Sequence, residues 1–293
     1  MSDASLLNSS TRKSMHWRLI VLLLVLIVSV QGIIYLFILG PEPLFSKETG
    51  IITDVDTIPV GIRKLLKAYP DYLIGATSNS LIWKDSTVMP YDDGIQNKDY
   101  EALLLTPDLE DQMSKKYVKG RDFPDPTENV TDTTKIRYTP FFEKMYGSTH
   151  AEVHGKLALV RWLPKTQKLK MYVTTVNDIH KKIQAISDEL DNHPEWLKYV
   201  RNPGGAFNWR SIRGTDRKSA HSFGIAVDIN IRYADYWLWD KQMGRPHKYK
   251  NRYPIEIIEL FEKYGFIWGG KWYYYDTMHF EYRPEMLIDE ASL

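Results

Sequence analysis

The feature that most constrains this chain is the apolar run from Leu19 to Leu39, LIVLLLVLIVSVQGIIYLFIL. A helix of this length would span about 31 Å, close to the thickness of the hydrocarbon core of a bilayer. Arg12, Lys13 and Arg18 precede the run, whereas residues 41–43 (Pro-Glu-Pro) follow it. Because basic residues favour the cytoplasmic side of a membrane helix, we expect the N-terminus in the cytoplasm and everything after the run outside.

A cleaved signal peptide is the competing interpretation of this run. Its apolar region would usually be about 7–15 residues long, and this one is longer. No clear small-x-small cleavage site follows it. We therefore favour an uncleaved transmembrane anchor and a single-pass membrane protein.

The rest of the chain divides around this anchor. We predict a cytoplasmic tail over residues 1–18, a transmembrane helix over 19–39 and a tether over 40–56. The extracytoplasmic region then has an N-terminal part, 57–150, and a C-terminal domain, 151–293, which carries the motifs described below.

Composition excludes some functions. The formal net charge is +1, which gives no support to nucleic-acid binding. The chain contains no cysteine, so it has no disulfides, and a metal site would have to use histidines and carboxylates.

Hydrophobic periodicity predicts several elements of the C-terminal domain. Apolar alternation over 157–163 and 168–173 predicts a β-hairpin. Apolar residues from Val176 to Leu190 follow helical spacing, and a second helix is expected from Pro254 to Tyr264. Residues 225–231 are typical of a buried strand.

The end of the chain predicts further strands. Phe266–Trp268 and Lys271–Tyr275 flank a glycine pair, which indicates a hairpin that leads into a final strand over 278–282. Since side chains alternate along a strand, His279 and Glu281 should share one face, while Met278 and Phe280 point into the core.

Two stretches concentrate the residues that could carry chemistry. The first is Ser219–Asp228, SAHSFGIAVD, and the second is Asp276–Glu281, DTMHFE. Catalytic zinc sites use three protein ligands and leave one position open. His221, Asp228 and His279 would supply those ligands. Asp276, three residues before His279, would then be the general base that takes a proton from the attacking water.

Each stretch alone is a weak signal, but the pair in this order resembles the M15 family of zinc D-Ala-D-Ala peptidases. SAHSFGIAVD follows the family's S-x-H-x-x-G-x-A-x-D pattern, and DTMHFE follows its second motif. Gly204–Arg210 and Trp268–Trp272 are similar to segments of a VanY-like branch. The resemblance covers about residues 145–285, extends more loosely over residues 57–145 and leaves the anchor out.

The resemblance implies an α+β fold, with a small antiparallel sheet and flanking helices, of the Hedgehog/DD-peptidase type. It also implies that His221, Asp228 and His279 bind Zn²⁺ and that Asp276 is the catalytic base. The implied substrates are peptidoglycan stem peptides, and the favoured activity is that of a D-Ala-D-Ala carboxypeptidase. Dipeptidase members carry Glu at the base position, so the Asp of this chain argues against a free dipeptide as the main substrate.

Substrate charge could be held by the basic segment from Arg210 to Lys218. Arg210 matches the family motif and is the first choice for contact with a substrate carboxylate or a developing oxyanion, and Arg213 is the second. The alternative is a solvated basic loop.

Three other functions stay open at this stage. One is an L-Ala-D-Glu endopeptidase of the same family. Another is a non-catalytic, zinc-containing module that binds the cell wall, and the third is a structural envelope protein with a vestigial site. The presence of both histidines and both aspartates favours an enzyme.

Overall fold

The computed structural model describes residues 58–114, 116–126, 135–212 and 215–293. All of them belong to one compact unit, which covers residues 52–293. The α-helices of the described residues are α2 (Val60–Ala68), α3 (Tyr100–Leu105), α4 (Leu109–Met113), α5 (Thr139–Tyr146), α6 (His150–His154), α7 (Ile179–Leu190), α8 (Leu197–Val200), α9 (Trp237–Gln242) and α10 (Ile255–Lys263).

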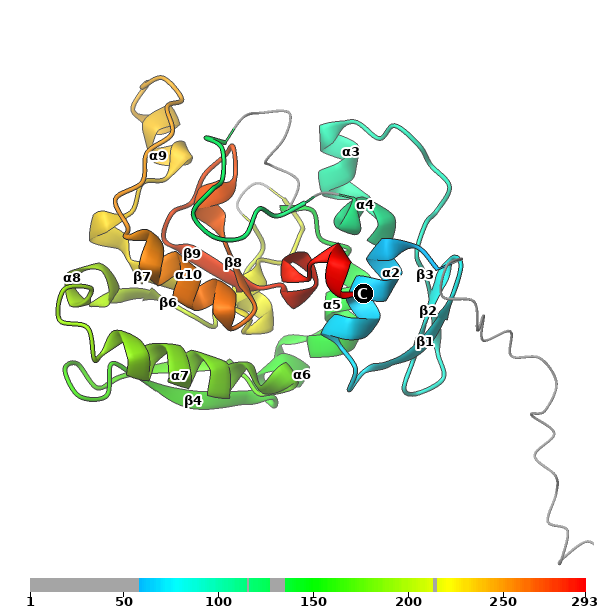
Figure 1. Cartoon of the computed structure of the whole chain (residues 1–293), viewed down its shortest axis with the longest axis horizontal. Coiled ribbons are helices and arrows are strands. Elements are labelled where there is room, and N and C mark those ends of the chain that lie inside the picture. The colour runs from blue at the N-terminus through cyan, green and yellow to red at the C-terminus, as the bar shows by residue number, and fades with distance from the viewer. Residues whose placement is uncertain (1–57, 115, 127–134, 213–214) are drawn as a thin grey trace, which may run out of the picture. The chain divides into compact units, whose positions relative to one another are not determined.

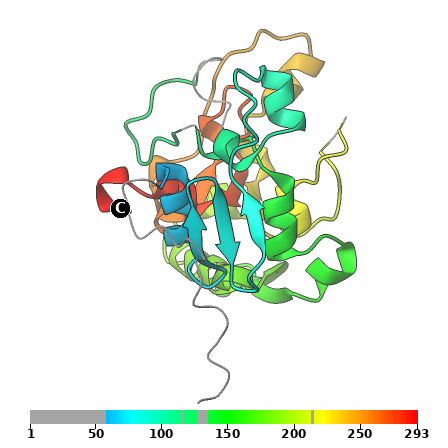
Figure 2. The same cartoon turned by 90° about the vertical axis from the view of Figure 1, so that its right-hand side faces the viewer.

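The strands form small antiparallel sheets, which confirms the α+β class (Figure 1). The first sheet has the order β1-β2-β3, the second is the pair β4-β5, and the third has the order β6-β7-β9-β8. The strands are β1 (Leu73–Thr77), β2 (Ser80–Trp83), β3 (Val88–Pro90), β4 (Leu157–Trp162), β5 (Leu169–Thr174), β6 (Pro203–Gly205), β7 (Ala226–Asn230), β8 (Phe266–Trp268) and β9 (His279–Tyr282). Figure 2 brings the β1-β2-β3 sheet to the front.

The hairpin β4-β5 and helix α7 confirm two elements that were predicted from hydrophobic periodicity. Ile179, Ile183, Ile186 and Leu190 are all completely buried, so the apolar face of α7 packs on the hairpin. The helix begins at Ile179, three residues after the first apolar position. Asn177 and Asp178 both have φ of 56°, and this left-handed backbone separates a short 3-10 turn from the helix.

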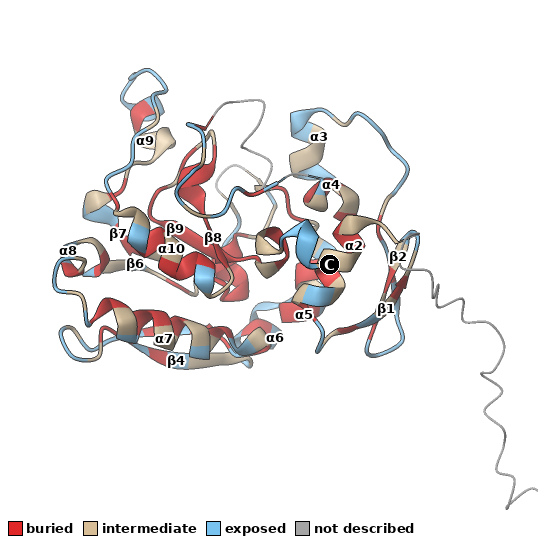
Figure 3. Ribbon diagram, in the orientation of Figure 1, coloured by how far each residue is buried: buried red, intermediate tan, exposed pale blue. Residues whose placement is uncertain are grey.

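In the four-stranded sheet β6-β7-β9-β8, the strands β7, β8 and β9 are almost entirely buried, whereas β6 is partly exposed (Figure 3). Helix α10 packs against β8 and ends at Lys263, before Gly265. All four residues of β9 are buried, so both faces of this strand are covered. His279 and Glu281 share a face, as predicted, and Phe280 lies in the core.

One hydrophobic core joins residues on both sides of position 150. It includes Ile62 and Leu65 of α2 as well as Phe261 of α10 and Phe280 of β9. Because the two predicted parts, 57–150 and 151–293, share this core, their division remains a prediction from the sequence.

One predicted strand is wrong. Residues 271–275 are not a strand, and β8 pairs directly with β9. The physical reason is the burial of Lys271, whose Nζ donates to Glu262 Oε1 at 2.6 Å and to the carbonyl oxygens of Val118 and Gly120 at 2.7 and 2.9 Å. These bonds draw the segment towards α10 and away from the sheet.

Among the described residues, no helix has the length and apolar character that crossing a membrane requires. The predicted tail, transmembrane helix and tether lie in residues 1–56, outside the described residues.

Candidate metal centre

Strand register brings together the first two residues of the site. β7 and β9 are antiparallel neighbours, and Asp228 pairs directly with His279. Residues opposite one another in such a pair project from the same face, with Cβ atoms about 5 Å apart. The pairing therefore joins a carboxylate and an imidazole that lie 51 positions apart in the chain.

His221 is placed by the turn that precedes β7. It lies in a short 3-10 helix, Ala220–Phe223, which ends at Gly224 with φ of 67°. A Cβ atom on Gly224 would lie 2.8 Å from Leu157 Cδ2 and 3.0 Å from the backbone nitrogen of Thr174. Both the backbone angle and the space therefore require glycine, and the tight turn directs His221 back over β7.

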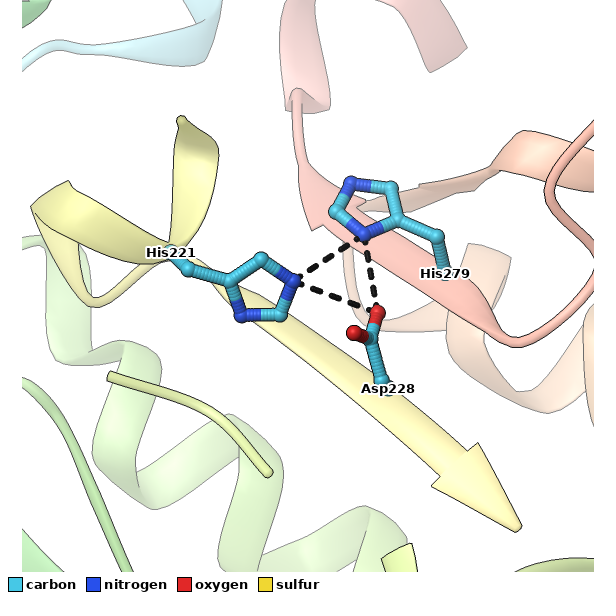
Figure 4. Close-up of side chains that lie close together, drawn as sticks. All are labelled: His221, Asp228 and His279. Atoms are coloured by element: carbon cyan, nitrogen blue, oxygen red, sulfur yellow. Dashed lines mark hydrogen bonds and ion pairs between the residues drawn. The ribbon is translucent and has the colours of Figure 1, made fainter. Parts of the chain in front are cut away.

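Three ligand atoms converge at one point (Figure 4). His221 Nε2 lies 3.3 Å from His279 Nδ1 and 3.2 Å from Asp228 Oδ1. His279 Nδ1 lies 3.0 Å from the same carboxylate oxygen. Both imidazoles are buried, with 4% and 8% of His221 and His279 exposed. The three residues predicted as metal ligands are thus brought together.

The outer nitrogen of each imidazole has its own partner. His221 Nδ1 lies 2.5 Å from the carbonyl oxygen of Ala206, and His279 Nε2 lies 3.2 Å from Glu281 Oε2. Both partners are acceptors, so in the metal-binding state these nitrogens carry the protons. Nε2 of His221 and Nδ1 of His279 then present lone pairs to a cation. The donor set fits a metal ion that prefers nitrogen and carboxylate ligands.

The pKa values in the metal-free site reflect the short distances between these side chains. Burial opposes the charged form of His279, but its hydrogen bonds to Asp228 and Glu281 raise its pKa to about 10. Burial likewise opposes ionisation of Asp228, yet the two imidazoles hold the pKa of its carboxyl well below the usual range. Without a metal, a proton takes the place of the cation among these groups.

Asp276 lies beside the ligands, just before β9. Its backbone nitrogen donates to the carbonyl oxygen of Gly269 at 3.0 Å, and its own carbonyl accepts from the nitrogen of His279 at 3.2 Å. Oδ1 is buried and has no hydrogen-bond partner among the described residues. Burial and then repulsion from Asp228 raise the pKa of Asp276 to about 6. Such a carboxyl is suited to accept a proton near neutral pH.

Arg210 is anchored by its backbone and exposes its side chain. Its nitrogen donates to Ser222 Oγ at 2.9 Å, and its carbonyl accepts from the nitrogen of Ser219 at 3.1 Å. These bonds tie the segment to the turn that carries His221. Arg213, the second choice for a substrate contact, lies outside the described residues.

Acidic residues gather elsewhere without making an equivalent site. Asp92, Asp93 and Asp108 come together, as do Asp108, Glu110 and Asp111. Neither group contains an imidazole. Lys98 Nζ binds Asp93, Asp108 and Asp111 at 2.9, 3.4 and 2.6 Å, so a side-chain cation already compensates these carboxylates.

Sequence reasoning gave no role to the residues that support the ligands. Glu281 stood out as a carboxylate beside His279, and strand alternation was the signal that placed both on one face. Arg137, whose Nη1 donates to Glu281 Oε2 at 2.7 Å, carried no signal because it lies 144 positions away. The carbonyl of Ala206 is a backbone group and could not be identified from residue type.

An α+β fold in which two imidazoles and one carboxylate converge at a buried point, with a second buried carboxyl nearby, is typical of metal-dependent hydrolases. Residues 213–282 match the family model described as D-alanyl-D-alanine carboxypeptidase. This segment therefore belongs to the M15 peptidase family. It contains His221, Asp228, Asp276 and His279, whereas Arg210 and Arg137 lie outside it.

Comparison of the chain with curated proteins gave no significant match, and comparison with solved structures gave none either. The family match does not distinguish the VanY-like branch from other branches.

Proposed function

We propose that this chain is a zinc-dependent peptidase that hydrolyses peptidoglycan stem peptides as a D-Ala-D-Ala carboxypeptidase. The observation that carries the proposal is the convergence of His221 Nε2, Asp228 Oδ1 and His279 Nδ1 within the segment that matches the M15 family. The Oδ1 atom of Asp276, which is buried and has no hydrogen-bond partner among the described residues, supports an enzyme rather than a binding module.

The three converging atoms would hold the zinc ion. Two imidazole nitrogens and one carboxylate oxygen are a common ligand set of catalytic zinc. When bound, zinc supplies Lewis acidity, which makes water reactive at neutral pH. The protein fixes the two imidazoles through Ala206 and Glu281, so neither ring has to reorient before the metal binds.

Asp276 would move the proton. Its carboxylate takes a proton from the attacking water as the water oxygen adds to the scissile carbonyl carbon. The same proton then passes to the leaving amine as the carbon–nitrogen bond breaks. The pKa of about 6 leaves Asp276 ionised at neutral pH and able to accept that proton.

Arg210 is our first choice for the residue that meets substrate charge. Its exposed side chain and anchored backbone are compatible with contact to an arriving carboxylate. A guanidinium offers two parallel donors, which match the geometry of a carboxylate.

We also propose that the run Leu19–Leu39 anchors the protein in a membrane, with the N-terminus in the cytoplasm. The catalytic unit would then be extracytoplasmic, where peptidoglycan peptides are its partners. The motivation is the length of the run and the basic residues before it.

The decisive test is turnover of purified muropeptides. Wild-type protein should contain about one zinc ion per chain and release D-Ala from pentapeptide stems. Asp276→Ala should keep its zinc and lose activity by about 10²–10⁴-fold, which is the usual contribution of general acid–base catalysis. As a matched control, Asp188→Ala changes an exposed aspartate on α7 and should retain full activity.

Product analysis separates the remaining alternatives. Cleavage between L-Ala and D-Glu without release of D-Ala would identify the endopeptidase instead. Zinc and muropeptide binding without any turnover would identify a binding module. A wild-type rate in Asp276→Ala would remove Asp276 from the mechanism.

A further inference from the structure

A buried cluster of charges lies directly behind His279. Arg137 Nη1 donates to Glu281 Oε2 at 2.7 Å, and Arg283 Nη1 donates to Glu281 Oε1 at 3.3 Å. Arg283 Nε also donates to Glu285 Oε1 at 2.5 Å. Arg137 is 7% exposed and the other three residues are completely buried. Two positive and two negative side chains therefore compensate one another inside the protein.

Stability alone is a poor explanation for this cluster. Removing charges from water is costly, and well-packed apolar residues of similar volume are often equally stabilising. Charges buried in this way are better explained by what they hold in place. Among the groups that contact them is the imidazole of His279, whose Nε2 lies 3.2 Å from Glu281 Oε2.

One carboxylate oxygen links the cluster to the site. Glu281 Oε2 accepts from Arg137 Nη1 and also lies 3.2 Å from His279 Nε2. Arg283 engages the other oxygen of the same carboxylate, so the group is held at both oxygens. A fixed acceptor at Nε2 keeps the proton there and turns Nδ1 towards Asp228 and His221.

Arg137 also contacts the segment that carries His221. Its Nη2 donates to the carbonyl oxygen of Lys218 at 3.3 Å, three residues before His221. One guanidinium therefore contacts both ligand-bearing segments, with one donor on each. A lysine ammonium is a compact charge without the rigid planar fork, so it cannot reproduce both contacts in the same geometry.

We propose that Arg137 is a positioning residue of the metal site: through Glu281 it orients His279, and through the Lys218 carbonyl it holds the His221 segment. This inference rests on the proposed metal site. It assigns a role in that site to the region before α5, outside the segment that matches the peptidase family.

The test measures zinc affinity of the full chain, purified in detergent, by competition with a chromophoric chelator. Arg137→Lys keeps the charge and should weaken zinc binding about tenfold, the lower end of the range for residues that support metal ligands. Arg121→Lys is the matched control. Arg121 pairs with Glu259 at 3.1 and 2.9 Å on the surface, and its replacement should leave zinc affinity unchanged.

A charge-balanced double variant tests whether the Arg137–Glu281 ion pair supports the metal site. Arg137→Met/Glu281→Leu removes one charge of each sign and leaves the Arg283–Glu285 pair intact. It should unfold cooperatively like the wild type and bind zinc about 10–100-fold more weakly. If the double variant does not fold, the zinc affinity of Arg137→Lys alone tests the proposal. Wild-type zinc affinity in Arg137→Lys overturns the proposal, even where the double variant is impaired.

A spectroscopic readout separates this inference from the proposed function. The Nε2 proton of His279, bonded to Glu281, should give a slowly exchanging downfield resonance in the proton NMR spectrum. Its exchange should accelerate in Arg137→Lys and stay unchanged in Arg121→Lys. If wild-type protein binds no zinc, the proposed function fails, and this resonance still decides the role of Arg137. Equal exchange in wild type and Arg137→Lys would refute it.

Discussion

Each histidine of the candidate metal centre would offer a metal ion a single nitrogen, because its other nitrogen already has a hydrogen-bond partner. Ala206 accepts from His221 through a backbone carbonyl, whereas Glu281 accepts from His279 through a carboxylate. The two imidazoles therefore differ in electrostatics. A negative partner on the outer nitrogen raises the basicity of the inner one.

Protons and metal compete for His279, which makes metal binding pH-dependent. In the metal-free chain the pKa of His279 is raised to about 10, so the ring carries an extra proton at pH 7–8 that must leave when a cation binds. We predict that zinc affinity rises about tenfold per pH unit between pH 6.5 and 8. Calorimetry at pH 7.5, in buffers that differ in ionisation enthalpy, should count about one released proton.

The same raised pKa stabilises the metal-free fold fully below about pH 6.5, and this contribution is lost as the pH rises through about 10. Zinc should remove that dependence because the bound ring cannot protonate. Zinc binding without proton release would contradict the arrangement around His279.

At the scale of elements, the site depends on one strand pairing and one turn. A slip of one residue between β7 and β9 would move Asp228 to the opposite face from His279. The pairing is protected because Val227, Ile229 and Phe280 are completely buried. The turn at Gly224 then adds His221.

Gly224→Ala tests the turn. The substitution forces a Cβ into a left-handed backbone and to within 2.8 Å of Leu157 Cδ2. We expect the free energy of unfolding to fall by about 1–2 kcal/mol from the backbone alone, with a further loss from the contact. Zinc affinity should also fall because the turn at Gly224 sets the position of His221. Chemical denaturation and zinc titration measure the two effects.

Gly244→Ala is the matched control. Gly244 has nearly the same φ, 65°, but a Cβ there would meet no atom within 4 Å in the part of the chain that the structure describes. It should show the backbone cost of about 1–2 kcal/mol and leave zinc affinity unchanged. Equal effects of both variants on zinc binding would show that the turn does not place His221.

At the scale of the whole molecule, the proposed anchor would place the described unit outside the cytoplasm. In bacterial spheroplasts that express the full chain, protease added outside should digest the unit and leave a short N-terminal fragment. The reason is that Leu19–Leu39 would span the membrane with its basic flank inside. An N-terminal tag detects the fragment on a blot.

Detergent provides the control for this experiment. Once the membrane is dissolved, the same protease should also remove the N-terminal fragment. Protection of the whole chain in intact spheroplasts would reverse the proposed orientation, and release of an untagged soluble domain would favour a cleaved signal peptide.

Local patterns in the sequence were sufficient for much of the fold. The spacing of Ile179, Ile183 and Ile186 identified α7, and apolar alternation identified β4 and β5. Such patterns are reliable because one buried face imposes a period on residues close in the chain. The strand predicted over Lys271–Tyr275 does not form. The buried ammonium of Lys271 bonds to Val118 and Glu262, and these contacts outweigh the local pattern.

The sequence by itself also determined which residue types the site could use, since without cysteine only imidazoles and carboxylates were available. Tertiary structure alone decided that Asp228 faces His279 and that Arg137 stands behind Glu281. The physical reason is distance along the chain. Periodicity describes neighbours within a few residues, whereas a pairing across 51 positions and an ion pair across 144 exist only after the common core has packed.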